Sequence, residues 1–417
     1  MIQRIKNIPV NAFQLFQLMR YGGIIIAGVL LTHRGYSMED INEYEHILFW
    51  VSFLSFFWTS GILNQYLKSR EEQIIATLQG LFAMSALFSM LIMGLLYFID
   101  RPSIAMSCFY LLIFQPIGYI IEYYLLRNKK HASLIGYGLF IFGTSIASIL
   151  LGDSLSEIIE YIIAFQCFKW LIIGIILFKS DKLTSLFTID WTAISELIRI
   201  SAPLSLSILI SGSGEYIDGI LVEKFASEKF SIYRYGAREL PIIFVLANAL
   251  SISAIPKISS HYKEGLAYLK KSGAFIMNIS FPLSIVLMMS SKFLFAFFFT
   301  EKFTESALIF NTYLLLLIPR TLFPQTILNS IGQTKTILKS SIYELIINIL
   351  LSYFLMQFFG ILGIAIGSVI AYSFDKAYLI WQLKKMNGTL ISQYTEVKKW
   401  LIMSLVIIAV YVLSFYM

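Results

Sequence analysis

Charged side chains are scarce in this chain of 417 residues. They make up 14% of it, whereas soluble domains usually carry about a quarter. No hydrophilic stretch is long enough to fold as a soluble domain, and the uncharged runs each approach the roughly 20 residues that cross a bilayer as a helix. The sequence therefore predicts an all-α membrane protein from end to end.

Cysteine and histidine are also rare, which removes several kinds of site. Cys108 and Cys167 both lie in apolar runs, so they indicate neither a disulfide framework nor a redox compartment. The four histidines lie in connectors far apart in the chain, so we expect no metal site and no cofactor. The net charge of +7 is scattered in ones to fours between apolar runs, which is typical of membrane orientation signals and not of a nucleic-acid-binding stripe.

Apolar segments predict twelve core helices and one more that follows them. The first six segments lie at about 12–32, 47–67, 74–98, 103–126, 132–151 and 158–178. The second six lie at about 200–222, 230–255, 272–299, 305–330, 337–359 and 361–383, and the last covers about 400–416. Because no small-residue cleavage site follows the first basic residues, we expect a retained first helix and no signal peptide.

The basic residues test this helix count independently. With the N-terminus placed in the cytoplasm, the inner connectors hold twenty lysines and arginines and the outer connectors hold five. This asymmetry is what the positive-inside rule predicts, and one missed helix would reverse every later connector.

The longest inner connector divides the core into two halves. It predicts an N-terminal six-helix lobe at 1–178, a cytoplasmic linker at 179–199, a C-terminal six-helix lobe at 200–385 and an extra transmembrane helix at 398–417. Because six is even, both lobes enter the membrane the same way round, as parallel repeats around a central cavity do.

Thirteen charged residues fall at membrane depth, where each costs at least about 2.5–3.5 kcal/mol unless it meets a cavity or a partner. The basic ones are Arg20, Lys169, Arg234, Arg238, Lys292, Arg320 and Lys376. The acidic ones are Glu122, Glu215, Asp218, Glu239, Glu344 and Asp375.

Some of these charges have simpler interpretations. Glu122 and Arg234 lie near helix ends and can reach the membrane surface, and Arg320 can bond carbonyls freed by the prolines on either side of it. Asp375 and Lys376 are adjacent, so we expect them to point to different faces. Arg20 and Lys169 are closest to mid-span and are the strongest candidates for lining the cavity.

Glycines surround two carboxylates in the segment Ser211–Gly219. Glu215 and Asp218 are three residues apart and share a helix face, and the glycines would let the backbone open toward a cavity. The alternative is close helix packing, with the acids paired to Arg238 or Lys292. Protonation of Asp218, Glu215 or Glu344 is one way to couple transport to a proton gradient.

In the next predicted helix, Arg234 and Arg238 are four residues apart and are expected on one face. Two guanidinium groups there suit the capture of phosphate or carboxylate.

Several of these segments resemble one family. The segments are Ser201–Ser205, Tyr216–Asp218, Ile232–Arg238, His33–Gly35 and Phe57–Ile62. They resemble the polysaccharide transporters, the Wzx-type flippases of the multidrug/oligosaccharidyl-lipid/polysaccharide exporter superfamily. The resemblance implies alternating access in the bacterial inner membrane, moving an undecaprenyl-pyrophosphate-linked oligosaccharide, such as an O-antigen repeat, to the outer leaflet.

The resemblance also implies which groups meet the cargo and which proteins are partners. The groups that would meet pyrophosphate or acidic sugars are Arg20, Lys169, Arg234, Arg238, Lys292 and Arg320. A polymerase and chain-length proteins are possible partners besides membrane lipid. The thirteenth helix, at about 400–416, departs from the twelve-helix core of the family.

Two other functions remain open from the sequence. A multidrug exporter of the same fold would bind organic cations in an acidic cavity, whereas the intramembrane charges here lean basic. An integral-membrane glycan polymerase would present a substantial outer loop, whereas no outer connector exceeds about fifteen residues.

Overall fold

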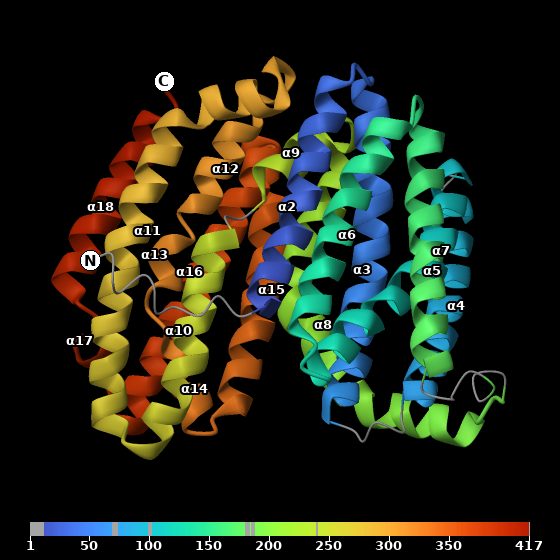
Figure 1. Cartoon of the computed structure of the whole chain (residues 1–417). Coiled ribbons are helices and arrows are strands. Elements are labelled where there is room, and N and C mark those ends of the chain that lie inside the picture. The colour runs from blue at the N-terminus through green and yellow to red at the C-terminus, as the bar shows by residue number, and fades with distance from the viewer. Residues whose placement is uncertain are drawn as a thin grey trace. The chain divides into compact units, whose positions relative to one another are not determined.

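The computed structural model describes residues 12–68, 74–98, 102–179, 184, 188–238 and 241–416. Every regular element within those residues is a helix, as Figure 1 shows. The chain forms two compact units, Met1–Leu209 and Ile210–Met417. The boundary between them lies inside a continuous helix, and the predicted lobes and linker stay predictions.

The described residues of the first unit form six complete helices and the beginning of a seventh. They are α2 (Ala12–His33), α3 (Met38–Lys68), α4 (Ile74–Phe98), α5 (Pro102–Arg127), α6 (His131–Leu151), α7 (Leu155–Lys179) and the first part of α8 (Trp191–Phe225). Each of the first six predicted segments coincides with one of these helices, since an uncharged apolar run of this length satisfies its backbone polar groups within lipid only as a helix.

Helix α8 begins nine residues before its predicted start because polar residues cap it. Asp190 Oδ1 accepts hydrogen bonds from the backbone N–H groups of Thr192 and Ala193, at 3.0 and 3.1 Å. The Thr192 hydroxyl also donates to this carboxylate, and these bonds hold the pKa of Asp190 below its usual value. An aspartate at this position satisfies backbone donors that the first helical turn leaves open.

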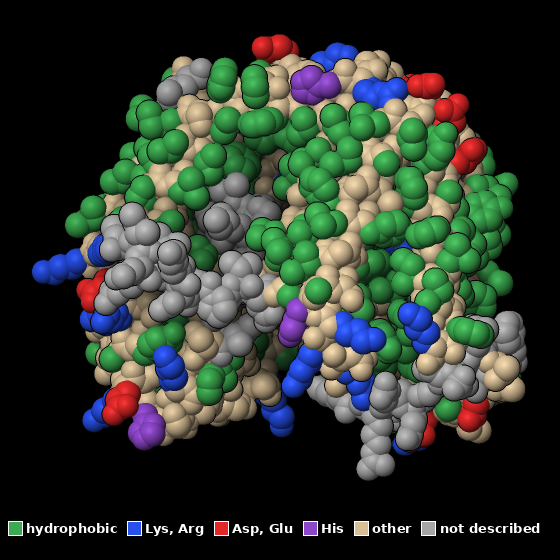
Figure 2. Space-filling model, in the orientation of Figure 1, with side chains coloured by type: hydrophobic (Ala, Val, Ile, Leu, Met, Phe, Trp, Pro, Cys, Tyr) green, Lys and Arg blue, Asp and Glu red, His purple; other side chains and the backbone are tan. Residues whose placement is uncertain are grey.

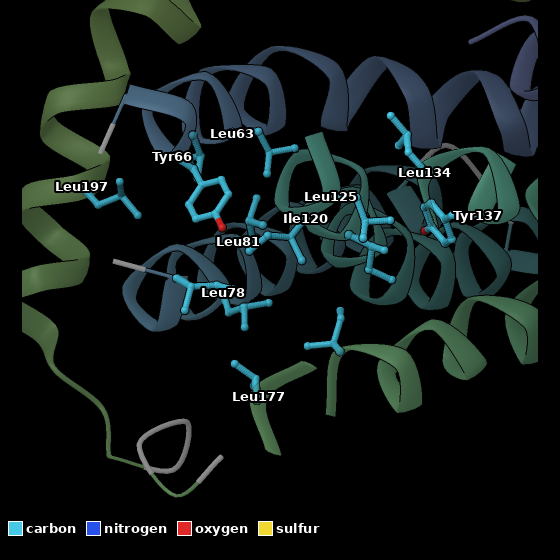
Figure 3. Packing of buried hydrophobic residues seen from close by; sticks show 14 of the residues in the cluster. Leu63, Tyr66, Leu78, Leu81, Ile120, Leu125, Leu134, Tyr137, Leu177 and Leu197 are labelled. Atoms are coloured by element: carbon cyan, nitrogen blue, oxygen red, sulfur yellow. The ribbon is translucent and has the colours of Figure 1, made fainter. Parts of the chain in front are cut away.

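The core of the first unit gathers side chains from consecutive helices and from one helix that comes later in the chain. Figure 3 shows Leu63, Leu81 and Ile120, from α3, α4 and α5, gathered beside the Tyr66 ring. Leu197 from α8 belongs to the same cluster. Because lipid tails are as apolar as leucine, such a core stabilises the unit through close packing and not through removal from water.

The second unit contains the rest of α8 and a series of shorter and longer helices. They are η3 (Ser227–Lys229), α9 (Phe230–Gly236), α10 (Pro241–Ser260), α11 (Tyr262–Phe299), η4 (Glu301–Phe303), α12 (Ser306–Leu314), α13 (Leu317–Arg320), α14 (Pro324–Ser330), α15 (Thr334–Phe359), α16 (Ile361–Asn387), α17 (Ile391–Tyr394) and α18 (Val397–Leu413).

Two predicted single helices are broken in this unit, and a proline follows each break. The segment predicted at 230–255 divides into α9 and α10, with Pro241 as the first residue of α10. The segment predicted at 305–330 divides into α12, α13 and α14, with a bend of 44° before Pro324. Proline lacks an N–H and clashes with the carbonyl four residues earlier, so a helix ends ahead of it.

The two long helices α15 and α16 pack closely through small residues. A Cβ added to Gly367 would lie 2.5 Å from Ser352 Oγ and 2.6 Å from the Ser352 backbone nitrogen. The absence of a side chain at Gly367 therefore permits the close approach of the two backbones, as in other membrane helix pairs.

The described part of the chain has ten helices long and apolar enough to cross a membrane, or eleven if the bent α12–α14 segment is one span. Figure 2 shows hydrophobic side chains over much of the visible surface. Such apolar surfaces are typical of a multi-pass membrane protein, whose helices face lipid.

Candidate functional site

A buried ion pair joins α2 to α5 in the first unit. Arg20 Nη1 lies 3.2 Å from Glu122 Oε2, and the two side chains are 26% and 4% exposed. The guanidinium group also stands over the rings of Tyr21 and Tyr119, 5.5 and 5.6 Å from their centroids. Glu122 therefore lies inside the unit, and the alternative in which it reaches the membrane surface is wrong.

Lys169 of α7 is the second cation of this cluster and is 6% exposed. It interacts electrostatically with Arg20 and Glu122. Among the residues that the structure describes, however, no hydrogen bond or ion pair reaches its ammonium group. Since the Glu122 carboxylate is engaged by Arg20, the cluster carries one positive charge that no described residue pairs with. A buried ammonium group without a partner is costly, so this arrangement suits an anionic ligand.

Gly118 provides the space that the Lys169 side chain occupies. A Cβ added to Gly118 would lie 2.7 Å from Lys169 Cδ and 3.8 Å from Gln166 Oε1. The Gly118 carbonyl accepts a hydrogen bond from the Tyr137 hydroxyl at 3.0 Å. Gln166 Oε1 is buried without a hydrogen-bond partner. Helix α5 thus leaves a slot in which an ammonium group and an amide oxygen both lack partners.

A buried carboxylate, Asp218 of α8, forms the centre of a polar cluster in the second unit. It is 3% exposed, and its Oδ2 accepts hydrogen bonds from the Tyr313 hydroxyl at 2.9 Å and from the Ser368 hydroxyl. Tyr233 shares a hydroxyl–hydroxyl hydrogen bond with Tyr313. Asn348 lies within the same group, with its Oδ1 3.3 Å from Ser368 Oγ.

No cation neutralises Asp218 among the described residues, and its Oδ1 is buried without a hydrogen-bond partner. The pairing of Asp218 with Arg238 or Lys292, one alternative from the sequence, is therefore wrong. Hydroxyl donors and a free carboxylate oxygen form a site at which a proton or a small cation can bind. No group of three or more His, Cys, Asp or Glu side chains in the described residues can hold a metal ion.

The hydroxyl and amide partners of Asp218 were missed by sequence reasoning. Tyr313, Asn348 and Ser368 come from α12, α15 and α16, which are remote from α8 in sequence. Asn348 and Ser352 are four residues apart inside an apolar segment, and Ser352 donates to Asn348 Oδ1 at 2.7 Å. An uncharged polar pair at helical spacing within a membrane segment is the signal that could have identified this face.

A second charged cluster in this unit contains Asp375 and Lys376. Lys376 Nζ lies 2.7 Å from Asp375 Oδ2 and donates to Gln325 Oε1 at 3.2 Å. The Ser340 hydroxyl donates to the other Asp375 oxygen. The expectation that the adjacent charges point to different faces is wrong, because the long lysine side chain bends back to its neighbour.

Glu344 and Arg320 border this pair. Glu344 interacts electrostatically with Asp375 and Lys376, which places one of the predicted coupling carboxylates beside the second cluster and not beside Asp218. Arg320, at the end of α13, lies with its guanidinium carbon 5.7 Å from the Tyr372 ring centroid. The Lys376 ammonium stands 4.4 Å from the same centroid, so one tyrosine ring receives two cations.

The two arginines expected on one helix face do not share a helix. Arg234 lies in α9, which ends at Gly236, and Arg238 lies beyond that end. The Arg238 guanidinium carbon is 4.6 Å from the Tyr235 ring centroid. The predicted shared face is therefore wrong for this pair, because the helix ends ahead of Pro241 instead of continuing through Arg238.

The remaining predicted site residues are either exposed or lie outside the described part of the chain. Lys292 is exposed on α11, where it belongs to neither buried cluster of this unit. The side chain of Glu215 and the whole of Glu239 lie outside the described residues. Of the six cations expected to meet the cargo, the structure thus brings Arg20 and Lys169 together, and their roles remain predictions.

An all-α fold of long apolar helices that bury charged clusters defines a polytopic membrane protein. One solved structure described as lipid II flippase MurJ in an inward closed conformation matches with a TM-score of 0.66 at 17% identity, covering 96% of this chain and 97% of that one. A mutant of the Vibrio cholerae MATE transporter VcmN matches with a TM-score of 0.53 at 15% identity, covering 90% and 97%. A superfamily transporter from Pyrococcus furiosus matches at 0.50 and 13%, covering 92% and 96%.

The family itself follows from the sequence model described as lipid II flippase MurJ, which matches residues 46–417. The chain belongs to this family, and it is accordingly a flippase of lipid-linked precursors and not an enzyme. No curated protein sequence matches it.

Proposed function

We propose that this protein moves a glycan linked through pyrophosphate to an undecaprenyl chain across the bacterial inner membrane, from the cytoplasmic to the outer leaflet. The first candidate cargo is lipid II, because the family model that matches the chain bears its name. The excess of basic residues in the predicted inner connectors favours a cytoplasmic N-terminus.

The uncompensated charge at Lys169 is the observation that carries this proposal. Its ammonium group is buried beside an Arg20–Glu122 pair that is already neutral. Charged phosphate oxygens supply the charge-assisted hydrogen bonds that such a group lacks. An organic cation, the cargo of a multidrug exporter, would be repelled from the same place, so the cluster favours an anionic head group.

An O-antigen type repeat unit is the second candidate cargo. It is favoured by the resemblance of Ser201–Ser205 and Ile232–Arg238 to the polysaccharide transporters. Both cargoes share the polyprenyl pyrophosphate and differ in the attached sugars and peptide. A polymerase and chain-length proteins are expected partners only if the cargo is such a repeat unit.

Alternating access is the proposed mechanism. The predicted lobes at 1–178 and 200–385 would expose the head group first to the cytoplasmic side and then to the outer side, while the polyprenyl tail stays in lipid. The pyrophosphate would then avoid the high free energy of entering hydrocarbon, because it would stay in a cavity beside the buried cations.

Asp218 is the carboxylate that we propose for ion coupling. It is buried and hydrogen-bonded by hydroxyl groups, with one oxygen unoccupied. A bound proton or small cation would neutralise it, so the occupancy of this site can follow an ion gradient. Glu215 and Glu344 remain further candidates for the same role.

Flipping by purified protein in proteoliposomes tests the proposal directly. Labelled lipid II and a labelled lipid-linked oligosaccharide are offered separately, and the fraction reaching the opposite leaflet is followed with a membrane-impermeant reagent. We expect Lys169→Met to slow flipping of the preferred lipid at least tenfold. Lys179→Gln, at an exposed position on the same helix, is the matched control.

The outcomes separate the candidate functions. Faster flipping of lipid II or of the oligosaccharide lipid assigns the cargo. Export of an organic cation with neither lipid moved would instead assign a multidrug exporter and refute the proposal. Wild-type flipping by Lys169→Met would remove this lysine from the binding site.

A further inference from the structure

Helix α18 follows the twelve predicted core helices in the sequence, and one of its faces packs into the second unit. Its buried and half-buried residues include Trp400, Ser404, Ile407 and Tyr411, whose spacing places them on one side of a helix. This face packs along α11. Three of the four side chains are polar or carry a polar group, which is more than packing against an apolar helix requires.

The connector ahead of α18 is also attached to α11. Lys270 Nζ donates to the Ser392 carbonyl at 3.0 Å and lies 3.5 Å from Glu396 Oε1. The Tyr262 hydroxyl and the Thr389 hydroxyl are 2.6 Å apart. These bonds fix the start of α18, so its side chains have defined positions relative to the helices behind α11.

Two polar side chains of α18 reach past α11 to the broken segment α12–α13. The Trp400 indole donates from Nε1 to the Ile318 carbonyl of α13 at 2.9 Å. The Tyr411 hydroxyl lies 2.9 Å from the Thr312 hydroxyl of α12. Helix α18 thus contacts both pieces of the segment that precedes the 44° bend.

The Ile318 carbonyl can accept a hydrogen bond from another helix, because its own helix breaks just after it. A continuing helix would offer it the N–H of Leu322, but that N–H bonds to the Pro319 carbonyl at 3.3 Å. Phe323 then takes a positive φ of 55°, and Pro324 has no N–H to donate. A buried carbonyl that loses its helical partner needs another donor.

Trp400 supplies that donor, together with the Thr321 hydroxyl, which donates to the same carbonyl at 3.1 Å. Arg320 is the last residue of α13, in the turn that these two hydrogen bonds stabilise. The position of its guanidinium group over Tyr372 therefore depends on how this turn is held.

We infer that Trp400 is a positioning residue of the flippase: its indole hydrogen bond to Ile318 fixes the end of α13 and so places the Arg320 guanidinium group for the cargo. Helix α18 acts as a brace for the break ahead of Pro324. The inference rests on the proposed function and on the prediction from the sequence that Arg320 meets the anionic head group.

The test uses Trp400→Phe in the full chain, because phenylalanine keeps an aromatic ring and removes the N–H. In the proteoliposome assay we expect the KM for the preferred lipid to rise three- to tenfold while kcat stays within twofold of the parent. Trp381→Phe is the matched control, since Trp381 is 53% exposed on α16. Tyr411→Phe, which removes the contact to Thr312, is expected to raise KM less.

A double-mutant cycle with Arg320→Gln separates positioning from general stabilisation. If Trp400 acts through Arg320, Trp400→Phe changes KM less than twofold in the Arg320→Gln background, because coupled residues are not additive. Equal effects in both backgrounds, or a Trp400→Phe that behaves like Trp381→Phe, would overturn the inference. If Arg320→Gln leaves KM unchanged while Lys169→Met impairs flipping, the brace is refuted and the flippase function stands.

If Trp400→Phe does not purify as a folded protein, the same cycle is run with Tyr411→Phe. Coupling between Tyr411 and Arg320 then supports the brace, and additivity refutes it. Thermal stability of each variant in detergent is measured alongside, so that a KM change is interpreted only for protein that is folded.

Discussion

A methyl group placed at Gly118 tests whether the position of the Lys169 ammonium group matters as well as its charge. In Gly118→Ala the new Cβ would lie 2.7 Å from Lys169 Cδ and 3.7 Å from Nζ. Carbon atoms in ordinary contact are about 3.5–4.0 Å apart, so Cδ must move by about 1 Å. Because the lysine side chain is flexible, it can give way while the helices stay in place.

Gly118→Ala is expected to weaken cargo binding without lowering the stability of the protein. A hydrogen bond to a charged group contributes about 1.5–3 kcal/mol, and about 1.4 kcal/mol is a factor of ten, so losing one bond to the pyrophosphate raises KM about tenfold to a hundredfold. Alanine is up to about 1 kcal/mol more favourable than glycine within a helix. Gly118→Ala is therefore expected to unfold at the same temperature as the parent or higher.

The assay measures KM for the preferred lipid in proteoliposomes together with the unfolding temperature in detergent. Gly174→Ala is the control, since a Cβ at Gly174 of α7 meets nothing within 4 Å. If Gly118→Ala flips with the parent KM, the position of the Lys169 ammonium group does not control cargo binding. A variant that loses stability in parallel with activity would also contradict the prediction, because the methyl group would then disturb the packing and not the lysine.

Three other variants have defined expectations. Glu122→Gln leaves the Arg20 charge without its partner and is expected to lower the free energy of unfolding by about 1–3 kcal/mol; an unchanged unfolding temperature would contradict this. Asp218→Asn keeps a similar shape but cannot change its charge, so flipping should no longer respond to an imposed pH or sodium gradient, and a retained response would exclude Asp218 as the coupling site. Gly367→Val forces a branched side chain against the Ser352 backbone, and we expect a loss of about 1–3 kcal/mol in thermal unfolding, whereas Gly136→Val on open surface should have little effect.

The positions of most helices could be predicted from the sequence. The segment expected at 74–98 is α4 at those residues, and the other segments of the first half agree with their helices within a few residues, apart from the earlier starts of α3 and α7. The reason is that lipid offers no hydrogen-bond partners, so a long uncharged run must satisfy its own backbone. The breaks at α9–α10 and α12–α14 were missed, although Pro241 and Pro324 were visible in the sequence.

Membrane insertion, the presence of buried charge and the residues that carry it all follow from the amino-acid sequence. The partners of those charges follow from the tertiary structure. It pairs Arg20 with Glu122, leaves Lys169 without a direct ion pair among the described residues, and surrounds Asp218 with hydroxyl groups. Hydropathy depends on the local composition of the chain, so it can be obtained from the sequence alone. Pairing depends on which helix faces meet, and those faces belong to helices that lie up to 150 residues apart.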